Sequence, residues 1–88
     1  MGNFPGGSAF AMVAQITEGY LLVTERTFRR LAPPELEQLA FEIDKRLRGL
    51  RSESPPLEDV AALKARNRRL QRLNGARLML QTYRRRRR

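Results

Sequence analysis

The sequence predicts a mainly α-helical fold that is built on an antiparallel helical hairpin, with helices at about 34–51 and 55–73. Apolar residues recur at helical spacing over 36–50, which predicts an amphipathic helix. The short Ser- and Pro-rich stretch 52–56 ends this helix, and so short a link favours an antiparallel neighbour. The chain also contains an N-terminal β-hairpin or short helix and a basic C-terminal tail. If the N-terminal element is a β-hairpin, the fold is α+β.

The N-terminal segment 9–28 admits two interpretations. The first is a β-hairpin with its turn at Gly19. Its second strand, 20–24, has the β-branched and aromatic residues typical of a strand, and its first strand places four apolar residues on one face: Phe10, Met12, Ala14 and Ile16. The second is helical, with Ser8 capping a helix that ends near Gly19 and Thr24 capping a further short helix. We favour the β-hairpin.

The clearest element is the helix at 34–51. Its apolar residues fall within about 100° of the helical wheel and form a stripe: Leu36, Leu39, Ala40, Ile43, Leu47 and Leu50. Such a stripe requires a packing partner, either in the same chain or in another subunit. Burying each large aliphatic side chain contributes about 1.5–3 kcal/mol. Together with two leucines of the second helix, the stripe gives the candidate protein interface: Leu36, Leu39, Ile43, Leu47, Leu50, Leu63 and Leu70.

Charged residues support the same helix. Glu42 lies four residues before Arg46, and Asp44 lies four residues before Arg48, so two stabilising ion pairs are expected. Arg51 adds to the cations at the carboxyl end, where the helix dipole favours positive charge. These cations are therefore expected to stabilise the helix.

The second helix is expected to begin at Pro55 with Ser54 as its N-cap. Asn74 and Gly75 indicate its end. The following segment 76–83 is compatible with a resumed helix or with a strand. The domain organisation follows from this division of the chain: a flexible leader at 1–8, a single small domain at 9–83 and a disordered basic tail at 84–88.

Positive charge is concentrated at the carboxyl end of the chain. Residues 1–62 hold seven basic and nine acidic residues, whereas 63–88 hold eleven basic residues and no acidic one. Like charges at i, i+4 cost about 0.2–0.5 kcal/mol a pair, so an external anion is expected to neutralise this segment. The candidate nucleic-acid-binding residues are Lys64, Arg66, Arg68, Arg69, Arg72, Arg77, Arg84, Arg85, Arg86, Arg87 and Arg88.

These observations predict a small basic protein that binds the phosphate backbone of DNA or RNA with low sequence specificity. Arginine favours this function because its planar fork grips phosphate with two hydrogen bonds. Because its own core is small, the protein is expected to form a homo-oligomer or to join a protein partner in a larger assembly. The alternative is a helical protein–protein interaction subunit whose basic tail is a localisation signal. The expected location is intracellular: the nucleus in a eukaryote, and otherwise the cytoplasm or nucleoid.

Composition excludes several other classes. The chain has no Cys and no His, which removes disulfides, cysteine–histidine zinc sites and a histidine general base. No catalytic residue, metal ligand, cofactor or small-molecule substrate is therefore expected, and the chain is not expected to be an enzyme. No apolar run approaches the roughly 20 residues that span a bilayer, so a membrane partner is not expected.

Overall fold

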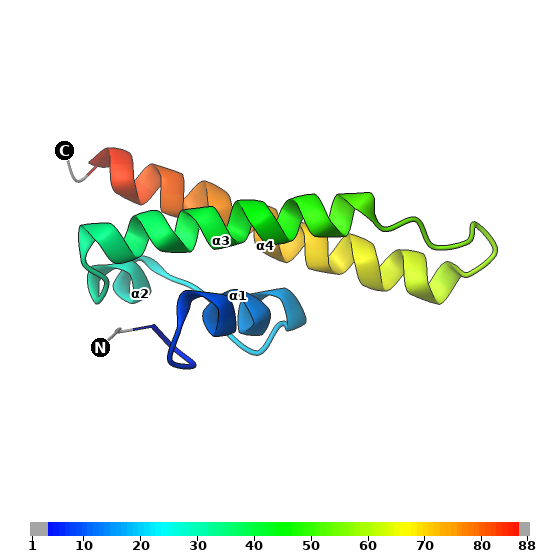
Figure 1. Ribbon diagram of the computed structural model, residues 1–88, viewed down its shortest axis with the longest axis horizontal. Helices are drawn as coiled ribbons and strands as arrows, with labels where there is room; N and C mark the ends of the chain where they lie inside the picture. Colours follow the sequence, from blue (N-terminus) through cyan, green and yellow to red (C-terminus); the bar gives the residue numbers. More distant parts are fainter. Residues whose placement is uncertain (1–3, 87–88) are drawn as a thin grey trace.

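The computed structural model describes residues 4–86, and within them the chain forms four helices and no strand: α1 (Ala9–Glu18), α2 (Glu25–Arg29), α3 (Pro33–Ser52) and α4 (Val60–Arg86). The two long helices lie side by side and run in opposite directions (Figure 1). Helix α1 packs against both of them, and α2 packs against α4. The prediction of a mainly α-helical fold is confirmed.

The favoured β-hairpin at 9–28 is wrong, because this segment forms α1, a linker and α2. Ser8 caps α1 through its Oγ, which accepts a hydrogen bond from the Ala11 N–H at 3.0 Å. The helix ends at Gly19, whose φ of 83° is left-handed and suits a residue without a side chain. Met12 and Ile16 lie four residues apart, a spacing that places them on one face of a strand but also on one face of a helix, and in α1 both are buried.

Helix α2 is the short helix that the second interpretation placed after Thr24. The Thr24 N–H donates to Oγ1 of Thr27 at 3.2 Å and so closes the first turn. Phe28 is buried, and its ring lies 5.5 Å from that of Tyr83 on α4. This aromatic contact holds the short helix against the carboxyl-terminal half of α4.

The leader also takes part in the fold. Phe4 is buried in the core, although 1–8 was expected to be flexible. A turn follows it, in which the Gly7 N–H donates to the Phe4 carbonyl oxygen at 2.9 Å. The burial of Phe4 outweighs the flexibility of the glycines that follow it, because a buried aromatic ring contributes a large apolar area.

The apolar stripe of α3 finds its mate within the same chain. Its five large members, Leu36, Leu39, Ile43, Leu47 and Leu50, are buried in the core, and Ala40 is partly buried against it. Facing them are the buried side chains of the other helices: Met12, Val13 and Ile16 of α1, and Leu73, Ala76, Leu80 and Tyr83 of α4. The apolar stripe of α3 is therefore buried by helices of the same chain, without the second subunit that the sequence allowed as its packing partner.

Helix α4 differs from its prediction at both ends. It begins at Val60 instead of Pro55, with the carboxylate of Asp59 accepting the Ala62 N–H at 3.1 Å, as an N-cap does. It continues past Gly75, because the buried residues beyond it keep the helical spacing and their packing outweighs the cost of about 1 kcal/mol for a glycine. Arg84 to Arg86 belong to α4 and not to a disordered tail, and 87–88 lie outside the described residues.

The molecule is elongated, with a longest extent of 45 Å. The start of the described chain and the carboxyl end of α4 lie at one end of this axis, and the 53–59 loop lies at the other (Figure 1). Over residues 4–86, no helix combines the length and the apolar character that crossing a membrane requires.

Candidate nucleic-acid interface

Arg66, one of the predicted phosphate ligands, closes the carboxyl end of α3. Its Nε donates to the Leu50 carbonyl oxygen at 2.9 Å, and its Nη2 donates to the Arg51 carbonyl oxygen at 3.3 Å. The last carbonyl groups of a helix lack donors from the helix itself, and the dipole makes this end negative. Arg66 therefore joins α4 to α3 and is not presented freely to an external anion.

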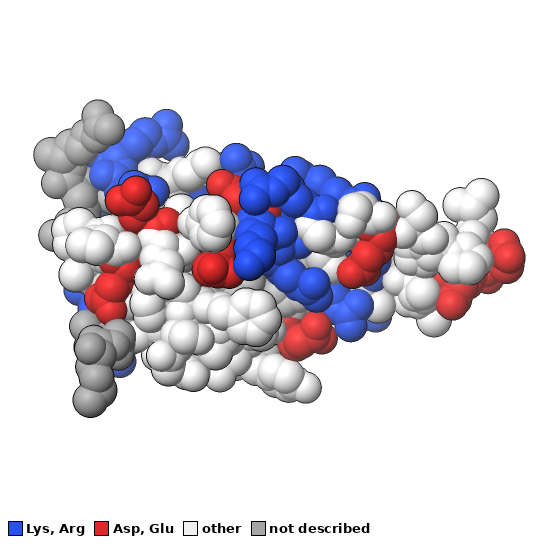
Figure 2. Space-filling view, viewed as in Figure 1, with Lys and Arg blue, Asp and Glu red and all other residues white. Residues whose placement is uncertain are grey.

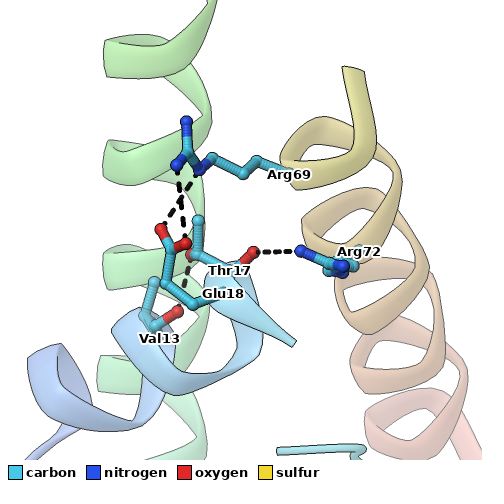
Figure 3. Close-up of polar contacts among 5 residues, drawn as sticks. All are labelled: Val13, Thr17, Glu18, Arg69 and Arg72. Atoms are coloured by element: carbon cyan, nitrogen blue, oxygen red, sulfur yellow. Dashed lines mark hydrogen bonds and ion pairs between the residues drawn. The ribbon is translucent and has the colours of Figure 1, made fainter. Parts of the chain in front are cut away.

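Arg69 and Arg72 fasten α4 to the carboxyl end of α1 (Figure 3). The Arg69 Nε lies 3.1 Å from Oε2 of Glu18, which makes an ion pair. The Arg72 Nη1 donates to the Thr17 carbonyl oxygen at 3.1 Å. The Thr17 side chain turns the other way, donating from Oγ1 to the Val13 carbonyl oxygen at 2.6 Å. Both arginines therefore have partners inside the molecule.

Two further predicted ligands pair with carboxylates. The Arg77 Nε lies 3.0 Å from Oδ1 of Asp44 on α3. The Arg86 Nη2 lies 2.6 Å from Oε1 of Glu25 on α2, and Arg29 approaches the same oxygen at 3.8 Å. The hydrogen bond from Arg86 lowers the pKa of Glu25, and the positive charges of Arg86 and Arg29 act in the same direction.

Five of the predicted nucleic-acid ligands thus hold α4 against the rest of the chain. The sequence shows no acid near them on α4, but the fold brings carboxylates from three other helices to Arg69, Arg77 and Arg86. Arg66 and Arg72 donate to backbone carbonyl oxygens instead. These ion pairs are partly exposed, and exposed pairs contribute about 0–1 kcal/mol each. An external anion must nevertheless compete with the internal carboxylates for these guanidinium groups.

The remaining predicted ligands divide into two groups. Lys64 and Arg68 in the first turns of α4, and Arg84 and Arg85 in its last turns, are exposed and have no hydrogen-bond or ion-pair partner among residues 4–86. Arg87 and Arg88 lie outside the described residues. The internal pairs divide the continuous cationic helix that the sequence suggested into two free clusters near its ends.

Among residues 4–86, four cations without a side-chain partner lie on α3, where the sequence predicts only stabilisation of the helix. Lys and Arg side chains gather over the carboxyl-terminal half of α3 (Figure 2). The basic residues of that half, named here the α3 basic patch, are Lys45, Arg46, Arg48 and Arg51. None of them has a side-chain partner in the described part of the chain.

The α3 basic patch is free because two expected ion pairs do not form. Asp44 turns to Arg77 on α4 instead of Arg48 on its own helix, and Glu42 makes no ion pair with Arg46 within the described residues. The signal available in the sequence was the three-residue spacing of Lys45, Arg48 and Arg51, which keeps neighbouring cations on one side of a helix. The acids beside these cations in the sequence indicated ion pairs within the helix instead.

The patch has a boundary on the side of α1. Lys45 and Arg46 line a hollow of about 420 Å³ between α1 and α3, and the same hollow is lined by Glu18 and Glu42. These carboxylates make the α1 side of the hollow unfavourable for an anion. A polyanion is therefore directed to the outer side of α3, where Arg48 and Arg51 are exposed.

The candidate protein-interface residues are placed inside the chain. The five of α3 are buried in the core, and Leu63 and Leu70 of α4 are half-buried, with Leu70 packed against the core. None of the seven is an exposed apolar side chain. The large apolar side chains that do reach the surface lie elsewhere, among them Leu22, Leu78 and Met79.

Comparison with known proteins gives no relative from which a function is transferable: no protein-family model, no curated protein and no solved structure matches this chain.

Proposed function

We propose that the protein binds the phosphate backbone of nucleic acid, DNA or RNA, with little sequence specificity. Its contacts are the α3 basic patch, Lys64 and Arg68 on α4, and the arginines at the end of α4. The single observation that carries the proposal is the set of exposed cations on α3 and α4 that have no internal partner, in a chain of net charge +9.

The chemistry of these side chains supports phosphate as the ligand. Arginine donates two parallel hydrogen bonds to phosphate oxygens and keeps its charge at every physiological pH. Contacts of this kind fix a protein on the backbone but carry no base information. The patch sits on a rigid helix whose inner face is buried in the core, so its spacing is fixed before the ligand arrives.

The five internally bonded arginines have a supporting role in this proposal. They set the position of α4 relative to α3 and α1, and Arg77 holds Asp44 away from Arg48. They do not contribute contacts to the nucleic acid at moderate salt. This division of labour differs from the sequence-based prediction, in which all eleven cations of residues 63–88 contact phosphate.

A salt titration of binding tests the proposal. The full chain is mixed with a fluorescent duplex DNA of mixed sequence or with a hairpin RNA, and anisotropy gives the affinity between about 50 and 200 mM salt. The eight described contacts, which are the four residues of the α3 basic patch with Lys64, Arg68, Arg84 and Arg85, predict a slope of log K against log salt of about −7 on duplex DNA. The double variant Lys45→Gln/Arg48→Gln is expected to make this slope shallower by about 2.

Two controls separate the patch from net charge. Asp44→Asn/Arg77→Gln removes a bridged pair and leaves the net charge unchanged, so affinity and slope should stay as in the parent chain. Gln38→Glu and Arg48→Gln each lower the net charge by one, but Gln38 lies toward the other end of α3, outside the α3 basic patch. Only Arg48→Gln should therefore reduce the slope of log K against log salt by about 1. Absence of binding at low salt, or equal slopes for these two variants, refutes the proposal.

The alternative function, a helical interaction subunit with a basic localisation signal, needs a different surface from the one that the sequence suggested. Substituting Asp for Ile43 does not separate the two functions, because Ile43 is fully buried and a charge there unfolds the chain. The exposed apolar residues on and beside α4, among them Leu22, Leu78 and Met79, are the surface that favours a protein partner.

A further inference from the structure

The carboxyl-terminal half of α4 presents an uncharged face to solvent. Gln71, Gly75, Leu78 and Thr82 recur at offsets of four, seven and eleven residues, which places them on one side of the helix, and all four are exposed. In a chain with 31% charged residues, an uncharged helical face of this length is unusual and is a feature of contact surfaces.

Two hollows adjoin this face and share Met79. One of about 340 Å³ is lined by Leu21, Leu22 and Val23 of the linker between α1 and α2, and by Gly75 and Ala76 of α4. The other of about 270 Å³ is lined by Phe28 of α2, and by Leu78 and Tyr83 of α4. We name this pair of hollows the α4 groove.

Large apolar side chains stand at the rim of the α4 groove without cover. Leu22 is 87% exposed, Leu78 is 62% exposed and Met79 is 42% exposed. Gly75 leaves a gap between them, and the fold does not require that gap, because a Cβ built at Gly75 meets nothing within 4 Å. A mid-helix glycine costs about 1 kcal/mol relative to alanine, so its presence favours close approach by another backbone.

Free cations lie beyond both ends of the uncharged face of α4. Arg68 and Arg85 continue the same helical side three residues before Gln71 and three residues after Thr82, and neither has a partner among the described residues. The rise of 1.5 Å per residue separates them by about 25 Å, the length of an α-helix of about 17 residues. The carboxylate that lines the groove, Glu25, is already bonded to Arg86.

We propose that the α4 groove binds one amphipathic helix of a partner protein, with apolar side chains in the middle of that helix and acidic residues at its two ends. Leucine-like side chains enter the two hollows, and the acidic ends reach Arg68 and Arg85. A second copy of this chain is the wrong occupant, because each copy has a net charge of +9 and would bring cations to cations. The groove is separate from the α3 basic patch.

Binding of a designed peptide to the full chain tests this proposal. The peptide has about 18 residues, leucines at helical spacing in its middle and glutamates at both ends. We expect it to bind at least about tenfold more tightly than two matched peptides, one with lysines at its ends and one with glutamines in place of the leucines. Equal affinity for the three peptides, or no binding by any of them, overturns the proposal.

Variants of the protein locate the site. Met79→Glu should weaken the acidic peptide at least about tenfold, whereas Leu57→Glu, at a residue that is 85% exposed in the far loop, should not. Circular dichroism checks that both variants stay folded. Arg68→Gln/Arg85→Gln should weaken the acidic peptide but not the peptide with lysine ends. Lys45→Gln/Arg48→Gln should leave peptide binding unchanged while it weakens nucleic-acid binding.

Two other occupants are outcomes of the same experiment. If the parent chain alone is a dimer by light scattering and Leu78→Glu makes it a monomer, the groove binds a second copy and the proposal is wrong. If vesicles of phosphatidylserine and phosphatidylcholine bind the parent chain but not Met79→Glu, and the peptide does not bind, the groove meets a lipid surface and the proposal is also wrong.

Discussion

The Nε of Arg66 lies 2.9 Å from the carbonyl oxygen of Leu50 and donates a hydrogen bond to it across the interface of α4 and α3. The Leu50 carbonyl already accepts the Glu53 N–H at 3.2 Å, and the neighbouring Gly49 carbonyl accepts the Ser52 hydroxyl at 2.7 Å. The carboxyl end of α3 is therefore bonded by its own loop and by the facing helix.

This contact predicts different costs for two neighbouring arginines. Arg66→Met should lower the free energy of unfolding by about 1–2 kcal/mol, because it removes a charged donor from the end of a helix. Arg68→Met should change it by less than about 0.5 kcal/mol, since Arg68 has no partner among the described residues. Urea unfolding followed by circular dichroism measures both, and equal costs would contradict the assignment of Arg66 to α3.

Two glycines should respond in opposite directions to alanine. Gly19 has a φ of 83°, and a Cβ there would lie 3.0 Å from Cζ of Arg72. Gly19→Ala should therefore destabilise the chain by about 1–2 kcal/mol. Gly49 lies inside α3 and a Cβ meets nothing within 4 Å, so Gly49→Ala should stabilise it by about 0.5–1 kcal/mol. Thermal unfolding of both variants checks the sign of each change.

The ion pair of Arg86 with Glu25 predicts a pH effect. In the folded chain the Arg86 hydrogen bond lowers the pKa of Glu25 below its ordinary value. The pair therefore stabilises the folded state fully at a pH above the ordinary pKa of a Glu side chain, and this stabilisation is lost as the pH falls through the pKa of the folded state. In Arg86→Gln the pKa of Glu25 should rise toward its ordinary value. Carbon-13 NMR of the side-chain carboxyl measures it, and an unchanged titration in the variant would show that the pair does not form in solution.

The enclosed α3 stripe predicts a fold that does not depend on self-association. Ile43→Ala should cost about 2–5 kcal/mol, because Ile43 is fully buried among α1 and α4. The unfolding midpoint of the parent chain should be the same at low and high protein concentration, since one chain completes the core. A midpoint that rises with concentration would show that a second subunit contributes to the core.

The sequence predicted those parts of the fold that depend on local periodicity. The stripe from Leu36 to Leu50 repeats over four turns, and the structure buries the same five residues. Element ends were less predictable because local signals compete with packing. Ser54 and Pro55 formed a sound start signal for a helix, yet Asp59 caps α4, and Gly75 did not end it because Tyr83 and Leu80 continue the buried face.

The roles of the arginines could not be read from the sequence, because their partners are remote in it. Glu18 lies 51 residues before Arg69, and Glu25 lies 61 residues before Arg86. Only the packing of α1 and α2 on α4 brings these groups together. The packing of α3 on α4 pairs Asp44 with Arg77 instead of Arg48 and so leaves the α3 basic patch free.

The positions of the two ends of the described chain have a consequence for protein engineering. Phe4 and the carboxyl end of α4 lie at the same end of the long axis, and the 53–59 loop, which contains no buried side chain, lies at the other (Figure 1). A circular permutant of the described residues, with a linker that joins their two ends and new termini in this loop, is therefore expected to keep every helix in place while the order becomes α4, α1, α2, α3.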